Sequence, residues 1–207
     1  MAFGDPARKQ AADSIRSLGR VAPDIPAVVV SDQPVPGAVL IERPDADPGA
    51  RTYKTSVYDL SPFDLTLYLD ADTVLLGDPT PGFDALSMYD LVIGQDVNRV
   101  FEENRWRHLV TEEVEATKAE IGTGHHMYFN SGVIFFRRNE RVAAMMRAWH
   151  EEWARWGQHD QMALLRAIHR CPVRILPMRE PWNTHRRRDA KFVFHNHRSA
   201  RREGAPR

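Results

Sequence analysis

The stretch Leu65–Leu76, LTLYLDADTVLL, decides the fold prediction because two acidic residues interrupt an otherwise apolar run. The residues before Asp70 are typical of a buried strand, and the apolar run resumes after Asp72. An unpaired carboxylate inside a protein core costs several kcal/mol, so both side chains need a partner at the end of a central strand. A bound cation supplies one, and oxygen ligands of this kind select Mg²⁺ or Mn²⁺.

A cation held by Asp70 and Asp72 would suit reactions in which a diphosphate leaves a carbon atom. Such an ion keeps coordination positions open for phosphate oxygens, and it neutralises a diphosphate leaving group when the bond to the attached carbon breaks. The pair also has an ordinary interpretation, because carboxylates are common in solvated turns between short strands. The acidic pair by itself leaves both interpretations open.

A second enzyme class uses the same residues. Leu67–Val74 resembles the nucleophile motif of haloacid-dehalogenase-type phosphatases, in which the first aspartate is phosphorylated and the second is the acid/base. Those enzymes carry the motif on their first strand and bind Mg²⁺ with a later acidic cluster. Here 69 residues with an α/β pattern precede Asp70, and no acidic pair lies near the C-terminus. A phosphatase is therefore the alternative enzyme.

Apolar runs and helical patterns alternate on both sides of the acidic pair. Short β-branched runs bounded by polar turn residues predict strands, and apolar side chains at three- and four-residue spacing predict helices. This alternation predicts a single α/β domain with a central mixed, mostly parallel sheet flanked by helices, and a site along the carboxyl edge of that sheet. The predicted strands are 27–32, 38–41, 65–69, 73–76, 91–94, 129–136, 173–177 and 192–195, and the predicted helices include 51–60, 141–156 and one that starts near Asp160.

The composition bears on partners and location. Lysine plus arginine and aspartate plus glutamate each number 28 and the pI is about 7.1, so no overall charge indicates nucleic-acid or anionic-membrane binding. A single cysteine, Cys171, excludes an internal disulfide, and no apolar stretch has the length of a membrane helix. We expect one soluble, cytoplasmic domain from these 207 residues.

Five segments stand in an informative order: Lys54, Leu67–Asp78 with its DAD motif, Phe129–Val133, Asp160-Gln161 and Pro181–Asn183. Together they resemble family 8 glycosyltransferases, which include glycogenin and bacterial galactosyltransferases. The resemblance covers nearly the whole sequence, and it implies a Rossmann-like GT-A domain over residues 1–197 and a basic C-terminal tail over residues 198–207. It also implies a truncated first strand, because the family has several apolar residues before the position of Ala2.

The resemblance implies a metal site for Mn²⁺ or Mg²⁺. Asp70, Asp72 and His195 would be the ligands, and Asp70, Ala71 and Asp72 would also bind the nucleotide part of the donor. A histidine after an apolar run is often structural, but an imidazole suits Mn²⁺. His197 is the alternative to His195, because the two stand in one short segment.

Basic residues complete the implied donor site. Lys54 would contact the phosphate or sugar of the donor, although an ordinary surface lysine would look the same in the sequence. The family grips the diphosphate with a lysine that this sequence lacks. A guanidinium is a sound phosphate partner, so Arg198 or Arg201 of the tail would take that place.

The resemblance implies that five further residues bind or act on the transferred sugar. Asn130, Ser131 and Gly132 would frame the donor sugar and the acceptor, with Gly132 allowing a close approach of the sugar to the backbone, although a strand that starts with an asparagine-rich turn explains them nearly as well. Asp160 and Gln161 would lie beside the anomeric carbon and, with Asn130, form the catalytic set. A helix N-cap is the competing interpretation of Asp160.

The expected function is transfer of a sugar from a nucleotide-diphosphate donor, UDP in the first place, to an acceptor hydroxyl. Retention of configuration at the anomeric carbon is implied by the resemblance alone. The acceptor stays open among a glycan, a protein, a lipid and a modified base. The alternatives are the phosphatase and a degenerate, non-catalytic binder of sugar nucleotides.

Overall fold

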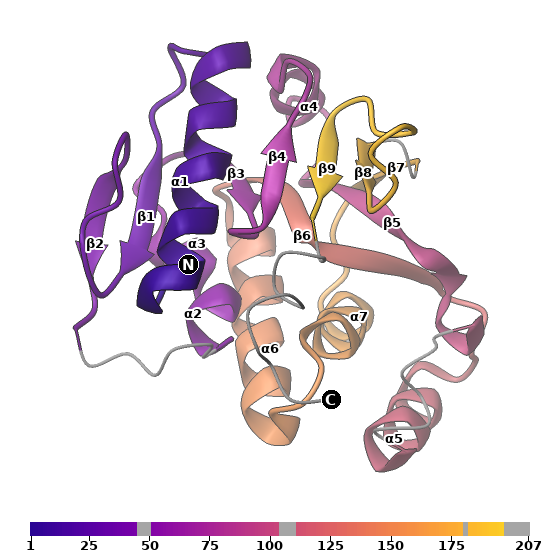
Figure 1. Cartoon of the computed structure of the whole chain (residues 1–207). Helices are drawn as coiled ribbons and strands as arrows, with labels where there is room; N and C mark the ends of the chain where they lie inside the picture. The colour runs from indigo at the N-terminus through magenta and orange to yellow at the C-terminus, as the bar shows by residue number, and fades with distance from the viewer. Residues whose placement is uncertain (45–50, 104–110, 180–181, 197–207) are drawn as a thin grey trace.

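The fold combines helices with three groups of strands, as Figure 1 shows. The structure, a computed structural model, describes residues 1–44, 51–103, 111–179 and 182–196. The helices are α1 (Gly4–Val21), α2 (Thr52–Thr55), α3 (Val57–Leu60), α4 (Thr80–Ala85), η1 (Phe101–Glu103), α5 (Thr111–Ile121), α6 (Glu140–Trp156) and α7 (Asp160–Arg170). The strands are β1 (Val28–Ser31), β2 (Val39–Glu42), β3 (Leu65–Leu69), β4 (Thr73–Leu75), β5 (Leu91–Val100), β6 (Met127–Arg137), β7 (Ile175–Met178), β8 (Asn183–Thr184) and β9 (Val193–His195).

The largest group of strands places β6 between β3 and β5. Its order is β3-β6-β5-β7, with β6 antiparallel to both neighbours and β5 parallel to β7. Leu69, the last residue of β3, is paired with Val133 of β6. The other groups are the parallel pair β1-β2 and the sheet β4-β9-β8, in which β4 is antiparallel and β8 parallel to β9.

The predicted mixed α/β class is confirmed, but the strands are less parallel than predicted. β6 is buried along most of its length, and a strand buried on both faces reads as a continuous apolar run whichever way it runs. The apolar pattern of residues 129–136 therefore indicated a strand without indicating its direction. As a result, the carboxyl end of β3 lies beside the middle of β6, and the site does not follow one carboxyl edge.

The main apolar core packs β6 against α6 and α7. Trp149 of α6 and Phe136 of β6 are fully buried there, and such side chains each contribute about 1.5–3 kcal/mol. α6 begins after Asn139, whose side chain caps the first turn, and ends at Gly157 with a φ of 67°. The helix predicted over residues 141–156 is thus confirmed, with one additional residue at its start.

On another side of the domain, α1 lies between β1 and β4 (Figure 1). Ser17 Oγ of α1 accepts a hydrogen bond of 2.9 Å from Leu75 N of β4, which ties the helix to the strand that follows the acidic pair. The predicted first strand is reduced to Ala2, which forms a single parallel bridge to Ser31 before α1 begins at Gly4.

Two predicted elements differ in detail, and one strand was not predicted. The helix predicted over residues 51–60 is two single turns, α2 and α3, which Ser56 separates. β5 continues past Gly94 through a polar segment whose residues had no strand pattern. β8 was missed, because two polar residues, Asn183 and Thr184, are too few for any periodic signal.

Among the described residues, no helix is both long enough and apolar enough to cross a lipid bilayer.

Candidate active site

Three potential metal ligands converge at the ends of β3, β4 and β9. Asp70 follows β3, Asp72 precedes β4, and His195 ends β9 opposite Thr73 in the register. His195 Nε2 lies 3.0 Å from Asp72 Oδ1 and 3.7 Å from Asp70 Oδ2. One ligand atom from each of the three residues lies within 4.8 Å of the other two. This spacing allows a single ion to contact all three.

The surroundings of His195 fit a cation at Nε2. Its Nδ1 lies 3.2 Å from Asn183 Oδ1, so both ring nitrogens face oxygen atoms. A neutral imidazole has only one N–H, so a hydrogen bond from Nδ1 would leave the lone pair of Nε2 directed at the carboxylates, where a cation would fit. Gly132 keeps the space beside the ring open, because a Cβ there would lie 2.3 Å from His195 Cε1 and 2.8 Å from Asp70 Oδ2. Two carboxylates and an imidazole are a ligand set that suits Mn²⁺.

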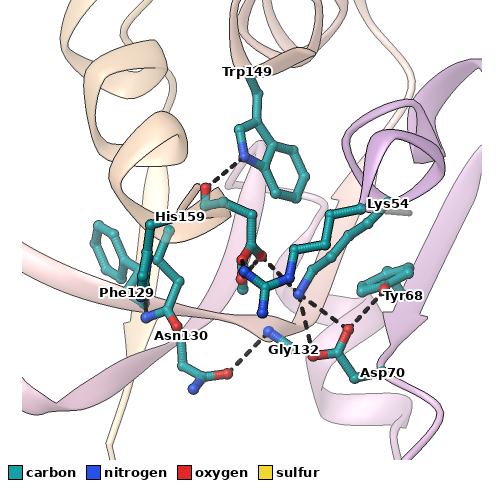
Figure 2. A network of polar contacts seen from close by, with 12 residues as sticks. Lys54, Tyr68, Asp70, Phe129, Asn130, Gly132, Trp149 and His159 are labelled. Carbon is teal, nitrogen blue, oxygen red and sulfur yellow. Dashed lines mark hydrogen bonds and ion pairs between the residues drawn. The ribbon is translucent and has the colours of Figure 1, made fainter. Parts of the chain in front are cut away.

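Lys54 lies between two of the carboxylates, as Figure 2 shows. Its Nζ is 3.1 Å from Asp70 and 2.9 Å from Asp160 Oδ2. Tyr68 donates its hydroxyl hydrogen bond to Asp70 Oδ1 at 2.7 Å, and Trp149 donates its indole N–H to the backbone oxygen of Asp160 at 2.8 Å. Tyr68 and Lys54 therefore hold the carboxylate of Asp70 in place, whereas Asp160 is held by Lys54 at its carboxylate and by Trp149 at its backbone.

The buried charges around Lys54 shift the pKa values of Lys54 and Tyr68. Burial lowers the pKa of Lys54, but the negative charges of Asp160 and Asp70 outweigh burial and hold that pKa above its ordinary value. Burial and the nearby Asp70 carboxylate raise the pKa of Tyr68 well above its ordinary value. Lys54 is thus a charged ammonium and Tyr68 a neutral hydroxyl. The interpretation of Lys54 as an ordinary surface lysine is wrong, since its side chain is buried.

Asp160 starts α7 but does not cap it. The N-cap position belongs to His159, and the Asp160 carboxylate instead accepts a hydrogen bond of 2.6 Å from Ser131 and lies 3.5 Å from Arg51. Burial by itself would raise the pKa of Asp160, but the charges of Lys54 and Arg51 and the Ser131 hydrogen bond hold it well below its ordinary value. The carboxylate is therefore ionised although it is buried.

A polar network beside this group includes a residue that the sequence analysis missed. Gln161 Nε2 donates to Asp96 Oδ2 at 3.0 Å and to the backbone oxygen of Phe129 at 2.9 Å. Asn130 Nδ2 also approaches Asp96 Oδ2, at 3.5 Å. Asp96 is buried on β5, two residues after the apolar run that ends at Gly94. A carboxylate close behind an apolar strand is the kind of signal that identified Asp70, and it could have found Asp96.

A pocket of about 270 Å³ opens among these side chains. A second pocket of about 360 Å³ is mostly apolar and extends between α1, β1 and β3, and Tyr68, Asp70 and Ala71 also line it. The smaller pocket holds the charged groups and is the better candidate for the chemistry. Its polar lining comprises Arg51, Lys54, Tyr68, Asp70, Asn130, Ser131, Asp160, Gln161 and His195, together with Gly132.

Most of the residues predicted for the site are thus neighbours in space. Asp72 reaches the group through His195, whereas Ala71 faces the apolar pocket and packs against the cluster around α1 and β1. His197, Arg198 and Arg201 lie outside the described residues, so the arginine predicted for the diphosphate and the alternative metal ligand have no structural account.

A comparison of the sequence with protein-family models finds the family described as nucleotide-diphospho-sugar transferase over residues 66–197. This range is more than half of the sequence and includes the acidic pair and His195. The chain therefore belongs to the nucleotide-diphospho-sugar transferase family, and its reaction is transfer of a sugar from a nucleotide-diphosphate donor. The glycosyltransferase resemblance seen in the sequence is confirmed, and the phosphatase alternative has no support.

Solved glycosyltransferase structures share the fold. The galactosyltransferase LgtC, in complex with donor and acceptor sugar analogues, is 16% identical with a TM-score of 0.55, and the alignment covers 88% of this chain and 73% of that one. Mouse xyloside xylosyltransferase 1 in its apo form is 13% identical with a TM-score of 0.59, and it aligns over 100% of this chain and 98% of its own. These similarities establish a GT-A-like fold.

The glycosyltransferase GlyE of Streptococcus pneumoniae TIGR4 is also similar, with 16% identity, a TM-score of 0.55, and coverage of 87% of this chain and 44% of that one. Among curated protein sequences, no significant match is found.

Proposed function

We propose that this site transfers a sugar from a UDP-linked donor to an acceptor hydroxyl with retention of configuration, and that it uses Mn²⁺, or Mg²⁺, held by Asp70, Asp72 and His195. The observation that carries the proposal is the convergence of these ligands within 4.8 Å, with Asp70 and His195 lining a charged pocket. When bound, the ion would neutralise the diphosphate leaving group. The donor diphosphate would therefore lie beside Asp70, Ala71 and Asp72.

The chain's own charged groups would act on the transferred sugar. Asp160 is ionised and lines the pocket, so it can bind the sugar hydroxyls or stabilise positive charge at the anomeric carbon. Lys54 holds Asp160 and Asp70 in place and can also contact a donor phosphate or hydroxyl. These preorganised charges would favour a transition state with positive charge at carbon over the neutral bound donor.

Amide and backbone groups would position the sugar. Gln161 and Asn130 are fixed through Asp96 and lie at the pocket wall, where they can bind sugar hydroxyls. Ser131 orients Asp160, and Gly132 leaves the space in which donor and metal would meet. Asn130, Asp160 and Gln161 remain the proposed catalytic set.

The proposal includes the domain and location expected from the sequence. The catalytic domain would be residues 1–197 and the basic tail 198–207, with Arg198 as the proposed contact to the diphosphate. The same proposal includes a cytoplasmic location. With a single cysteine, Cys171, the sequence has no internal disulfide, which is the feature that would indicate an oxidising compartment.

A panel of nucleotide sugars tests this function. The full chain with Mn²⁺ should release UDP from at least one UDP-sugar, and Asp72→Asn should abolish that release while the protein stays folded. Asp59→Asn is the matched control, because Asp59 is exposed on α3 and does not line the pocket. Release that Asp72→Asn leaves unchanged would remove the acidic pair from the mechanism. Stabilisation by UDP without release from any sugar would indicate a non-catalytic binder.

A further inference from the structure

Asn183 connects the metal ligand His195 to the sugar-binding side of the pocket. It is buried on β8, which is paired in parallel with β9, the strand that ends at His195. Its Nδ2 donates a hydrogen bond of 2.8 Å to Asn130 Oδ1, and its Oδ1 lies 3.2 Å from His195 Nδ1. A Cβ at Gly94 would lie only 3.1 Å from the Asn183 Cβ, so β5 closely backs this side chain.

The orientation of each amide in this chain of hydrogen bonds follows from one backbone group. The N–H of Gly132 can only donate, and it lies 2.9 Å from the Asn130 side chain, so Asn130 must present its oxygen there. The same Asn130 oxygen faces Asn183, which must therefore donate with its NH₂ group. The oxygen of Asn183 is then the atom that faces the His195 ring.

These hydrogen bonds allow only one neutral tautomer of the His195 imidazole. Because Asn183 Oδ1 can only accept, Nδ1 of His195 must hold a proton and donate it. The lone pair of Nε2 is then directed at the carboxylates of Asp72 and Asp70, where the proposed ion would be bound. The backbone of β6 thus determines, through two asparagine side chains, which nitrogen of His195 is available as a ligand.

We propose that Asn183 is a positioning residue that fixes the tautomer and ring orientation of His195 for metal binding, and so couples the metal site to the sugar-binding residue Asn130. The proposal rests on the metal site of the proposed function. Asn183 is not a ligand itself. Its effect on binding arises because a histidine whose other nitrogen is hydrogen-bonded is a better oriented and more basic ligand.

Mn²⁺ binding to the full chain, measured by isothermal titration calorimetry, tests this role. Asn183→Leu removes the acceptor for His195 at similar volume and should weaken Mn²⁺ binding by about 10–100-fold. Asn183→Asp keeps the acceptor while giving up the donor to Asn130, and it should restore binding. Thr184→Val is the control on the same strand, buried and nearly isosteric, and it should bind as the wild type does.

The outcomes separate this inference from the proposed function. A wild-type protein that binds no Mn²⁺ overturns the metal site and the role of Asn183 together. If the wild type binds and Asn183→Leu binds equally well, or if Asn183→Asp is as weak as Asn183→Leu, only the role of Asn183 is overturned.

Nitrogen-15 NMR of histidine-labelled wild-type protein gives a readout that does not depend on how the variants fold. His195, assigned by the loss of its signal in His195→Gln, should hold a proton on Nδ1. A bare Nδ1 overturns the proposal.

Discussion

Two groups of buried charged side chains contrast with each other in the described part of this domain, one between helices and one at the strand ends. The helix group joins Glu113 of α5, Glu152 of α6 and Arg166 of α7, all of them almost fully buried. The guanidinium of Arg166 donates to Glu152 at 2.8 Å, to Glu113 at 3.0 Å and to Thr117 at 2.6 Å. Arg170 adds a second positive charge at 3.0 Å from Glu152, so positive and negative charges are equal in number.

The strand-end group is unequal. Asp70, Asp72 and Asp160 bring three negative side chains together against two positive ones, the buried ammonium of Lys54 and the half-exposed guanidinium of Arg51, and His195 stands beside them. All members of this group except Asp72 line a pocket, whereas Glu113, Glu152 and Arg166 of the helix group are buried among packed side chains. A balanced, enclosed group fixes helices to one another, whereas an excess of negative charge around a pocket favours the binding of a cation. The balance of charge thus separates scaffold from site where burial alone does not.

Removal of Arg166 should have the largest effect on the stability of the fold. Arg166→Met leaves Glu113 and Glu152 buried without their main partner, and loss of one member of such a group costs about 3–5 kcal/mol. Urea denaturation should show this loss in the free energy of unfolding. Arg170→Met is the matched control at the half-exposed partner of the same Glu152, and it should cost less than about 1 kcal/mol. Equal costs would contradict the scaffold role of the helix group.

Gly132→Ala should act on the site group and spare the fold. The added Cβ would press against His195 and Asp70, and overpacking of this kind costs about 1–3 kcal/mol. If the bound state bears this cost, Mn²⁺ binding should weaken by about ten- to a hundredfold. Gly19→Ala is the control, because a Cβ at that helical position meets no atom within 4 Å. Unchanged Mn²⁺ binding in Gly132→Ala would place the ion elsewhere.

A third group, around Asp90, is partly buried. Its carboxylate is buried, and its arginine partners are half-exposed. Burial raises the pKa of Asp90, but hydrogen bonds from Arg174 and Asn139 outweigh it and lower that pKa to about 2. The stabilisation is therefore complete above pH ~4, the ordinary range of an aspartate, and is lost as pH falls toward 2. Exposure of Arg174 and Arg141 screens the interaction, so we expect about 1 kcal/mol.

Urea denaturation of the wild type and of Asp90→Asn at pH 5 and pH 3 measures this effect. The difference in unfolding free energy between the two proteins should shrink from the higher to the lower pH. A difference that stays constant over this window would show that the charge of Asp90 does not contribute.

The sequence predicted the site residues that interrupt an apolar pattern and missed buried polar residues that leave no such mark. Asp70 and Asp72 stand inside an apolar run, so their conflict with burial is visible in the sequence itself. Asn183 occupies a strand of two polar residues, which has no hydrophobic period. Asp96 lies in a polar segment of β5, where only its place close behind an apolar run marks it. Arg166 lies on an amphipathic helix, and the apolar pattern of that helix does not predict a buried arginine.

The fold class was predictable for a similar reason. Alternating strands and helices indicated an α/β domain, and the resemblance to glycosyltransferases selected the GT-A type. Strand direction was not predictable, because β6 is apolar on both faces. That direction brings Asn130 and Gly132 beside Asp70, so the contacts that complete the site could come only from the structure.

A thermal-shift experiment on the wild type and Asp72→Asn tests the central claim, that the strand-end group binds a cation and a nucleotide diphosphate together. In Mn²⁺, UDP at about 100 times its Kd should stabilise the wild type by about 2.7 kcal/mol beyond Mn²⁺ alone. For a domain of this size, that corresponds to a rise in Tm of roughly 5–10 °C. Asp72→Asn should show no UDP-dependent rise. A wild-type Tm that neither UDP nor any other nucleoside diphosphate raises in Mn²⁺ would contradict the account.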